Sequence, residues 1–167
     1  MASIQALKYH GGLPVSALKS ENLDAISRGI ENLKIHLENM SSFGVPIVVG
    51  LNKFNSDTDK EINHTLNLIE KLGFKGIVTD PYNRGGEGCI EMAKEVIKLA
   101  QSTIIKTKNF VYDLDEPVKT KIEKIAKKIY RAKDVKYTRK ALKDIEKIES
   151  IGFGNLPICI AKTQYSL

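Results

Sequence analysis

The apolar run at residues 45–51, Val-Pro-Ile-Val-Val-Gly-Leu, constrains the fold of this chain most. A continuous run of this kind is typical of a β-strand that is covered on both faces, as the strands of parallel sheets are. Parallel strands are joined by crossover connections, which are usually helical. The segments on either side of the run therefore decide whether an α/β fold is predicted.

Those flanking segments have helical periodicity. Ser20 is a candidate N-cap for a helix over residues 21–42, in which apolar residues recur on one face. Ser56 or Asp57 is a candidate N-cap for a second helix, which is expected to extend to about Leu72. The apolar run thus lies between two predicted helices.

The first part of the chain alternates between predicted strands and helices. Further strands are expected at residues 3–7 and 76–79, and a further helix at residues 89–102. This order predicts an α/β fold with three layers, in which a mostly parallel sheet has helices on both faces. We assign residues 1–102 to this α/β segment.

The second part of the chain has a different pattern. A linker near residues 103–117 is expected to precede helices at 118–130 and 138–151 and a final strand at 158–162. We assign residues 103–167 to a small helical C-terminal lobe with a terminal strand. This strand would stop close to the last residue, which suggests a fragment.

Composition excludes some classes of protein. The 167 residues are 42% hydrophobic and 28% charged, and no apolar run has the length of a membrane-spanning helix. The first residues do not resemble a signal peptide. Cys89 and Cys159 lack the spacing of a metal site, which favours a reducing cytoplasm and no metal cluster. The net charge of +6 comes mostly from lysines interleaved with glutamates, and no aromatic pattern indicates nucleic-acid binding.

Three polar loops follow the predicted strands, at residues 8–14, 52–57 and 80–88. In open α/β sheets, ligands bind beyond the carboxyl ends of the strands. These loops are therefore the default candidate site.

The first loop contains Lys8, His10 and two consecutive glycines, Gly11 and Gly12. Glycines allow the backbone to approach a ligand closely, and the two basic side chains could face an anion. The alternative is a plain turn with exposed polar residues. The spacing alone favours the plain turn.

The second loop places Phe54 between polar residues. An aromatic ring in such a loop either packs on the next helix or stacks on a ligand. GTPases have Asn-Lys-x-Asp after an apolar strand, but here the fourth residue is Asn55. The sequence also has no Gly-x-x-x-x-Gly-Lys-Ser/Thr phosphate loop, which argues against a GTPase.

The third loop carries Tyr82, Gly85 and Gly86 before a predicted helix. Backbone N–H groups at a helix N-terminus favour an anion. Tyr82 and Phe54 would lie at the same sheet edge, where a flat heteroaromatic ring such as a pterin could bind between them.

All three loops resemble motifs of the formate–tetrahydrofolate ligase family. The family's Ala-Leu-Lys-x-His-Gly-Gly is similar to residues 6–12, its Asn-x-Phe-x-Thr-Asp-Thr to residues 52–58, and its Trp-Ala-x-Gly-Gly-x-Gly to residues 82–88. Further matches occur at residues 112–130 and 161–166. The resemblance extends over essentially the whole chain.

This resemblance implies part of a ligase with a fold like that of P-loop NTPases. The family forms 10-formyltetrahydrofolate from formate, ATP and tetrahydrofolate through formyl phosphate, with Mg²⁺ and a monovalent cation, and assembles as a homotetramer. By position, Phe54 and Tyr82 would hold the pterin. Residues 78–80, which include Val78 and Asp80, would lie near adenine, and Lys8 and His10 match a motif on the nucleotide side.

The sequence also departs from the family pattern. Tyr82 replaces the usual Trp, Asn83 an Ala, Gln5 an Arg and Cys89 a Gly. The catalytic residues are unknown here, because the family's phosphate loop and formyl phosphate residues are expected upstream of this chain. We therefore expect the isolated chain to be inactive. The alternatives are a non-catalytic folate-binding or interaction protein, and one half of a split ligase that associates with a separate N-terminal portion.

Overall fold

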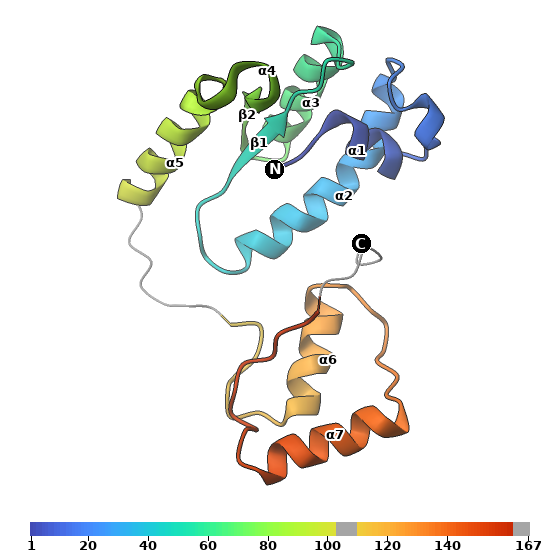
Figure 1. Cartoon of the computed structure of the whole chain (residues 1–167), viewed down its shortest axis with the longest axis vertical. Coiled ribbons are helices and arrows are strands. Elements are labelled where there is room, and N and C mark those ends of the chain that lie inside the picture. The colour runs from blue at the N-terminus through green and yellow to red at the C-terminus, as the bar shows by residue number, and fades with distance from the viewer. Residues whose placement is uncertain (103–109, 162–167) are drawn as a thin grey trace. The chain divides into compact units, whose positions relative to one another are not determined.

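The computed structural model describes residues 1–102 and 110–161 (Figure 1). The chain divides into two compact units, Met1–Thr107 and Lys108–Leu167, and each is described by itself. The elements in the first unit are α1 (Ile4–His10), the 3-10 helix η1 (Val15–Ala17), α2 (Leu23–Ser41), β1 (Val48–Asn52), α3 (Asp59–Lys71), β2 (Lys75–Thr79), α4 (Pro81–Arg84), the 3-10 helix η2 (Gly85–Cys89) and α5 (Ile90–Ser102). The second unit contains α6 (Val118–Lys128) and α7 (Arg139–Ser150).

The sheet of the first unit has two parallel strands, β1 and β2, with Val48 opposite Lys75 and Asn52 opposite Thr79. Helices α2 and α3 lie on one side of this sheet and α5 on the other (Figure 1). The predicted α/β class and the parallel pairing are therefore confirmed. The predicted strands at 45–51 and 76–79 correspond to β1 and β2.

The predicted strand at residues 3–7 is wrong, because these residues belong to α1. The Ser3 side chain accepts a hydrogen bond from the Ala6 N–H and so caps a helix that buries Ile4 and Leu7 on one face. Only a single parallel bridge, between Ala2 and Leu51, extends the sheet at this point. The sheet among the described residues is thus smaller than the sequence indicated.

Helices α1 and α2 pack closely through two glycines. A Cβ on Gly11 would lie 1.9 Å from the Ala25 carbonyl oxygen, and a Cβ on Gly29 would lie 1.8 Å from the Leu7 carbonyl oxygen. Neither position has room for a side chain. Gly11, which the sequence offered as a residue for close approach to a ligand, instead lets the two helices approach each other.

The core of the first unit lies between α1, α2, α3 and the β1 face that carries Val49 and Leu51. It is a cluster of ten buried residues: Ile4, Leu7, Ile26, Ile30, Leu33, Leu37, Val49, Leu51, Ile62 and Ile69. Those of α2 recur at the three- and four-residue spacing that predicted this helix. The core therefore fixes β1, whose carboxyl end leads into the loop with Phe54.

Helix α3 begins later than predicted. Its N-cap is Thr58, whose hydroxyl accepts from the Glu61 N–H while the Glu61 carboxylate accepts from the Thr58 N–H. This reciprocal capping box is stronger than the single hydrogen bond that Ser56 or Asp57 could supply, so both predicted caps are wrong. The Asp57 side chain is turned back to Phe54 instead.

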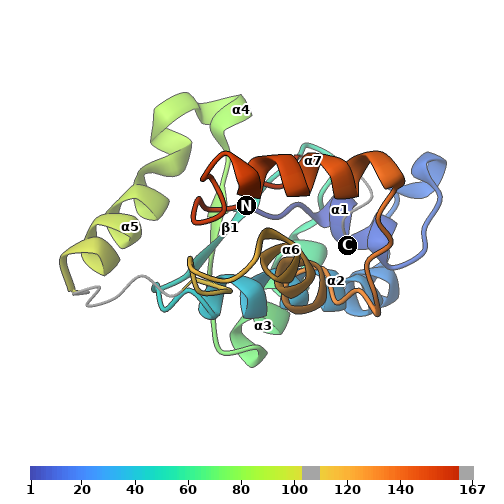
Figure 2. The ribbon, with the colours of Figure 1, turned by 90° about the horizontal axis from the view of Figure 1, so that it is seen from below.

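In the second unit, α6 and α7 run in different directions and contact each other (Figures 1 and 2). The Glu149 carboxylate of α7 accepts a hydrogen bond from the Val118 N–H at the start of α6, at 2.9 Å. Both predicted helices, at residues 118–130 and 138–151, are confirmed with slightly shorter bounds. The segment after α7 returns along this pair.

The predicted final strand at 158–162 is wrong for residues 158–161, which form no strand, while Lys162 lies outside the described residues. The chain after α7 is held by side chains instead of a strand partner. Lys121 donates to the carbonyl oxygens of Gly154, at 2.6 Å, and Leu156, at 3.3 Å. The Tyr112 hydroxyl accepts from the Ile158 N–H at 2.7 Å.

No helix in the described part of the chain is both long and apolar enough to cross a membrane.

Candidate ligand pocket at the strand ends

The loop after β1 presents Phe54 on a closed turn. The Asp57 carboxylate accepts a hydrogen bond from the Phe54 N–H at 2.8 Å, and the Asp57 N–H donates to the Phe54 carbonyl at 3.0 Å. Phe54 as a whole is 43% exposed. The backbone of Phe54 is therefore fixed while its side chain stays available to a ligand.

Asp57 is buried, unlike the ring that it supports. Its side-chain oxygen Oδ1 has no hydrogen-bond partner among the described residues. Burial, aided by the nearby Glu61 charge, raises the pKa of the Asp57 carboxyl, and the Phe54 hydrogen bond, Lys8 and Lys53 oppose this shift only in part.

The loop after β2 presents Tyr82 on the short helix α4. The Asp80 carboxylate caps this helix by accepting from the Asn83 N–H at 3.2 Å. The Asn83 side chain donates to the Asn55 side-chain oxygen at 2.9 Å and so joins this loop to the Phe54 loop. Tyr82 is 85% exposed.

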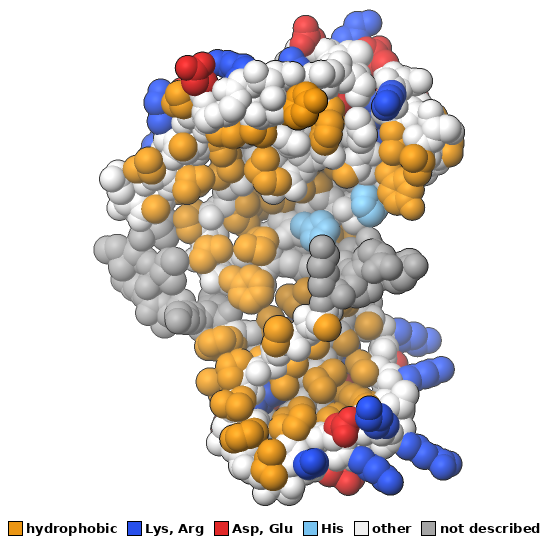
Figure 3. Space-filling model, viewed as in Figure 1, with side chains coloured by type: hydrophobic (Ala, Val, Ile, Leu, Met, Phe, Trp, Pro, Cys, Tyr) orange, Lys and Arg blue, Asp and Glu red, His pale blue; other side chains and the backbone are white. Residues whose placement is uncertain are grey.

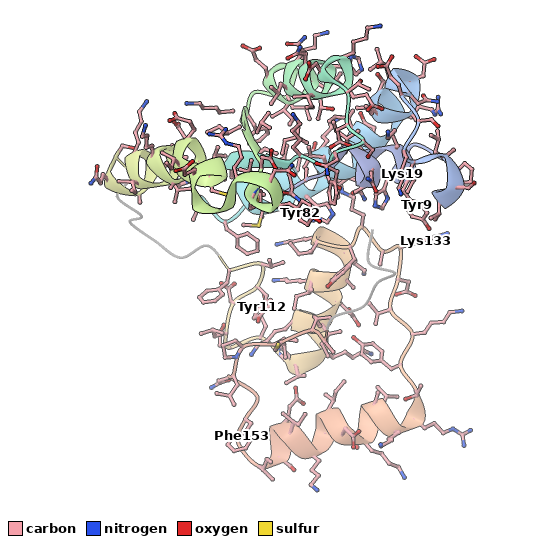
Figure 4. The ribbon with its side chains drawn as sticks, turned by 45° about the horizontal axis from the view of Figure 1, so that its top comes forward. Tyr9, Lys19, Tyr82, Tyr112, Lys133 and Phe153 are labelled. Atoms are coloured by element: carbon pink, nitrogen blue, oxygen red, sulfur yellow. The ribbon has the colours of Figure 1, made fainter. Side chains whose placement is uncertain are left out.

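The two loops meet at a cavity of about 460 Å³, whose described lining residues are Gln5, Lys19, Asn52, Lys53, Phe54, Asn55, Ser56, Pro81 and Tyr82. Phe54 and Tyr82, predicted to bind one ligand, thus line the same cavity. Lys19 reaches it from the turn after η1, and Tyr82 from α4 (Figure 4). The Gln5 side chain donates to the Ser56 hydroxyl at 3.2 Å, which joins α1 to the Phe54 loop.

Lys8 lies inside the fold, away from solvent. Its ammonium group donates to the Glu61 carboxylate at 2.8 Å and to the Ser20 carbonyl at 3.0 Å, and both charged side chains are fully buried. Burial favours the neutral form of Glu61, but hydrogen bonds from Lys8 and from the N–H groups of Asn22 and Thr58 outweigh it and lower the pKa of Glu61. The proposed role of Lys8 at the nucleotide side stays a prediction.

The other predicted site residues do not line this cavity. His10 is exposed, with its ring edge-on to that of Tyr9 at 5.7 Å between centroids, and Val78 is half-buried in β2. Asp80 is committed to capping α4. Gly85 has a φ of +55°, and open space surrounds the Cβ positions of Gly85 and Gly86. Their roles near a nucleotide also stay predictions.

Sequence reasoning missed two residues of this site, Lys19 at the cavity and Asp57 behind Phe54. Lys19 follows no predicted strand, so nothing in its local pattern placed it beside Phe54. Asp57 carried a usable signal, because an acidic residue three positions after a loop residue can accept a hydrogen bond from that residue's N–H. The competing interpretation of Asp57 as a helix cap obscured it.

The chain is an α/β protein with a cavity of aromatic and polar walls at the carboxyl ends of its parallel strands, which is where proteins of this class commonly bind small molecules. The model of the formate–tetrahydrofolate ligase family matches residues 1–167, and the chain belongs to that family.

Two curated relatives are similar over the whole chain. The formate–tetrahydrofolate ligase of Pseudothermotoga lettingae is 46% identical over 167 residues. That of Petrotoga mobilis is 44% identical over 168 aligned residues. In both comparisons this chain is covered completely but spans only 30% of the relative's length.

Proposed function

We propose that this chain supplies the tetrahydrofolate-binding wall of an ATP-dependent formate–tetrahydrofolate ligase, with Phe54 and Tyr82 on either side of the pterin. The observation that carries this proposal is the shared cavity. One aromatic side chain comes from the loop after β1 and the other from α4 after β2, and both line it.

The chemistry of the cavity supports this ligand. Each good aromatic contact to a flat ring contributes roughly 0.5–1.5 kcal/mol beyond its burial. Lys19 and Lys53 line the cavity, and no acidic residue is among its described lining residues. Tetrahydrofolate combines a pterin, whose pyrimidine ring is flat, with a glutamate tail that carries two carboxylates, so it offers a ring to the aromatics and negative charge to the lysines.

The whole reaction needs more than this chain contains. In the proposed ligase, formate, ATP and tetrahydrofolate react through formyl phosphate, with Mg²⁺ and a monovalent cation. The described residues contain no cluster of three His, Cys, Asp or Glu side chains that could hold a metal ion. With the phosphate loop expected upstream, the isolated chain lacks the main electrostatic stabilisation of phosphoryl transfer and is proposed to be inactive.

Within that proposal, residues 1–102 form the folate and nucleotide side and residues 103–167 the helical lobe. Val78 and Asp80 lie beside adenine, with Lys8 and His10 on the nucleotide side. The complete ligase acts in the cytoplasm as a homotetramer.

Calorimetric titration with tetrahydrofolate tests the folate site. We expect saturable binding by the wild-type chain, weakened by about tenfold or more in Phe54→Ala and in Tyr82→Ala. Tyr9→Ala is the matched control, because Tyr9 is an exposed tyrosine of the same unit that does not line the cavity. Absence of binding by folded wild-type chain, or equal loss in the Tyr9 variant, would refute the proposal.

An observation on α5 favours a second candidate, one half of a split ligase. This helix has no buried residue, and Ile90, Val96 and Ile97 are each at least 46% exposed. Hydrophobic side chains are visible over this part of the first unit in Figure 3. Mixing the chain with a separately produced N-terminal portion of a relative should then yield ATP-dependent formyltetrahydrofolate formation, which Ile97→Lys should reduce more than Lys98→Ala does.

A further inference from the structure

The turn between Phe54 and Asp57 differs from an ordinary exposed loop in how it is held. The Asp57 carboxylate accepts from the Phe54 N–H at 2.8 Å, and only 8% of the Asp57 residue is exposed. A serine or asparagine can close such a turn without burying a charge. The choice of a carboxylate here therefore calls for an explanation beyond the turn itself.

That carboxylate has a cost in stability. One of its oxygens, Oδ1, is buried without a hydrogen-bond partner among the described residues, and an unsatisfied buried polar atom is destabilising. In return, the ionised group makes a charge-assisted hydrogen bond, which is shorter and stronger than a neutral one. The partner of that stronger bond is the backbone of the aromatic residue at the cavity.

The charges around Asp57 come from three places. Glu61 on α3 repels its negative charge, whereas Lys8 on α1 and Lys53 in the same loop attract it. Lys8 is already paired with Glu61 at 2.8 Å, so its positive charge is shared between Glu61 and Asp57. The balance leaves the pKa of Asp57 above its ordinary value of 3.8.

We propose that Asp57 is a positioning residue, whose ionised carboxylate fixes the Phe54 backbone so that the ring stays at the cavity, and whose protonation loosens the ring and weakens ligand binding. This inference rests on the proposed folate site, because it assigns a consequence to the position of Phe54. Asp57 does not line the cavity and acts through Phe54 alone.

The first arm of the test needs no ligand. In nitrogen-15 NMR spectra, the Phe54 amide of the wild-type chain should be protected from exchange, and its chemical shift should follow the titration of Asp57. Asp57→Asn keeps an oxygen acceptor without the charge, so protection should fall only in part and the titration should disappear. Asp57→Ala removes the acceptor, and protection should be lost.

The second arm measures tetrahydrofolate affinity as a function of pH. Asp57→Ala should weaken binding about tenfold at pH 7, with a smaller loss in Asp57→Asn. The wild-type affinity should also fall relative to Asp57→Asn as pH drops toward 3.8, because only the wild type can protonate this group. Using the ratio of the two proteins cancels the titration of the ligand itself.

Asp59→Asn is the matched control, since it makes the same chemical change at an exposed aspartate two residues away. Thermal unfolding should show that Asp57→Asn is folded at neutral pH. An unchanged Phe54 amide in Asp57→Ala, or a wild-type to Asp57→Asn affinity ratio that does not vary with pH, would overturn the inference. If the wild type binds no tetrahydrofolate, the proposed function fails, and the NMR arm still decides whether Asp57 holds Phe54.

Discussion

Among the described residues, each unit of the molecule has one fully buried lysine, but the two lysines have different partners. Lys8 in the first unit pairs with the carboxylate of Glu61, which is equally buried. Lys121 in the second unit donates to two backbone carbonyls, those of Gly154 and Leu156, and lies 5.9 Å from the centre of the Tyr112 ring. One lysine is neutralised by an opposite charge, and the other is solvated by dipoles.

The difference between the two lysines goes with the amount of hydrophobic core in each unit. The first unit has a ten-residue hydrophobic cluster, and its buried ion pair joins α1, α3 and the turn before α2 around that core. In the second unit, the described buried hydrophobic residues are only Tyr112, Val118 and Ile125. Figure 3 shows hydrophobic side chains exposed on one face of this unit. Lys121 compensates there by tying down a segment that has no strand partner.

The largest effect should come from breaking the ion pair. Glu61→Ala leaves the Lys8 ammonium buried and unpaired, and it also removes the capping box of α3. We expect the free energy of unfolding of the first unit to fall by about 3–5 kcal/mol, measured by urea denaturation. Glu70→Ala, which changes an exposed glutamate of the same helix, should have little effect, and equal losses in the two variants would contradict this prediction.

Removing Lys121, the buried lysine of the second unit, should lower the free energy of unfolding by less. Lys121→Met leaves two carbonyl oxygens that water can reach once the segment loosens, and it leaves no unpaired charge behind. We expect a loss of about 2 kcal/mol in the second unit, with faster hydrogen exchange at Ile158. Lys127→Met is the control, because Lys127 is exposed on the same helix. A loss as large as that of Glu61→Ala would show that the two lysines are equivalent.

Acid should lower the free energy of unfolding of the first unit more than that of the second. The pKa of Glu61 is lowered in the folded chain, so its contribution to stability is complete above its ordinary value of 4.5 and is lost as pH falls through the lowered pKa. The contribution of Asp57 to stability varies with pH in the opposite direction. Because its pKa is raised in the folded chain, its ionisation lowers stability as pH rises.

Urea unfolding from pH 7 to pH 3 checks this prediction. The wild-type first unit should lose stability below pH 4.5, and Glu61→Gln should show a flatter profile from a lower starting point. The second unit depends on Lys121 bonded to carbonyls, so it should respond less over the same range. Parallel pH profiles for wild type and Glu61→Gln would be the contrary result.

The sequence predicted the longer helices α2, α3, α5, α6 and α7 well, because each carries apolar residues at a three- and four-residue spacing that a single segment reveals. It failed at two strands, where a local helix cap or a contact with a distant side chain outweighed the apolar pattern. Residues 3–7 contain enough apolar character for a strand, but Ser3 caps a helix there. Residues 158–161 have strand character, but the Tyr112 hydroxyl, 46 residues away, accepts the hydrogen bond from the Ile158 N–H, and Lys121 holds the preceding residues Gly154 and Leu156.

The same distinction applies to the residues of the candidate site: some could be predicted from the fold class, and others depend on contacts between distant residues. Phe54 and Tyr82 were predicted to lie together because both follow parallel strands, a property of the fold class that can be deduced without coordinates. Lys19 could not be placed at the cavity, since its position depends on how the turn after η1 packs. The burial of Lys8 was equally hidden, because its partner Glu61 lies 53 residues away.

The smallest predicted effect concerns the contact that joins the two aromatic loops. The Asn83 side chain donates to Asn55 at 2.9 Å on the exposed surface, in contrast to the partly buried hydrogen bond that holds Phe54. Asn83→Ala should change the free energy of unfolding by only a few tenths of a kcal/mol, because water replaces an exposed hydrogen bond. Tetrahydrofolate affinity should still fall by roughly twofold to threefold, since Tyr82 is no longer tied to the Phe54 loop.

Calorimetry of Asn83→Ala beside Asn67→Ala, an exposed asparagine of α3, separates these effects. Unchanged affinity in Asn83→Ala would mean that the partly buried hydrogen bond to Asp57 positions the aromatic pair without help from the surface. Affinity lost to the same extent as in Asp57→Ala would mean that the exposed bond is as important as the partly buried one. The intermediate result is the one we expect, because burial strengthens a hydrogen bond that water would otherwise replace.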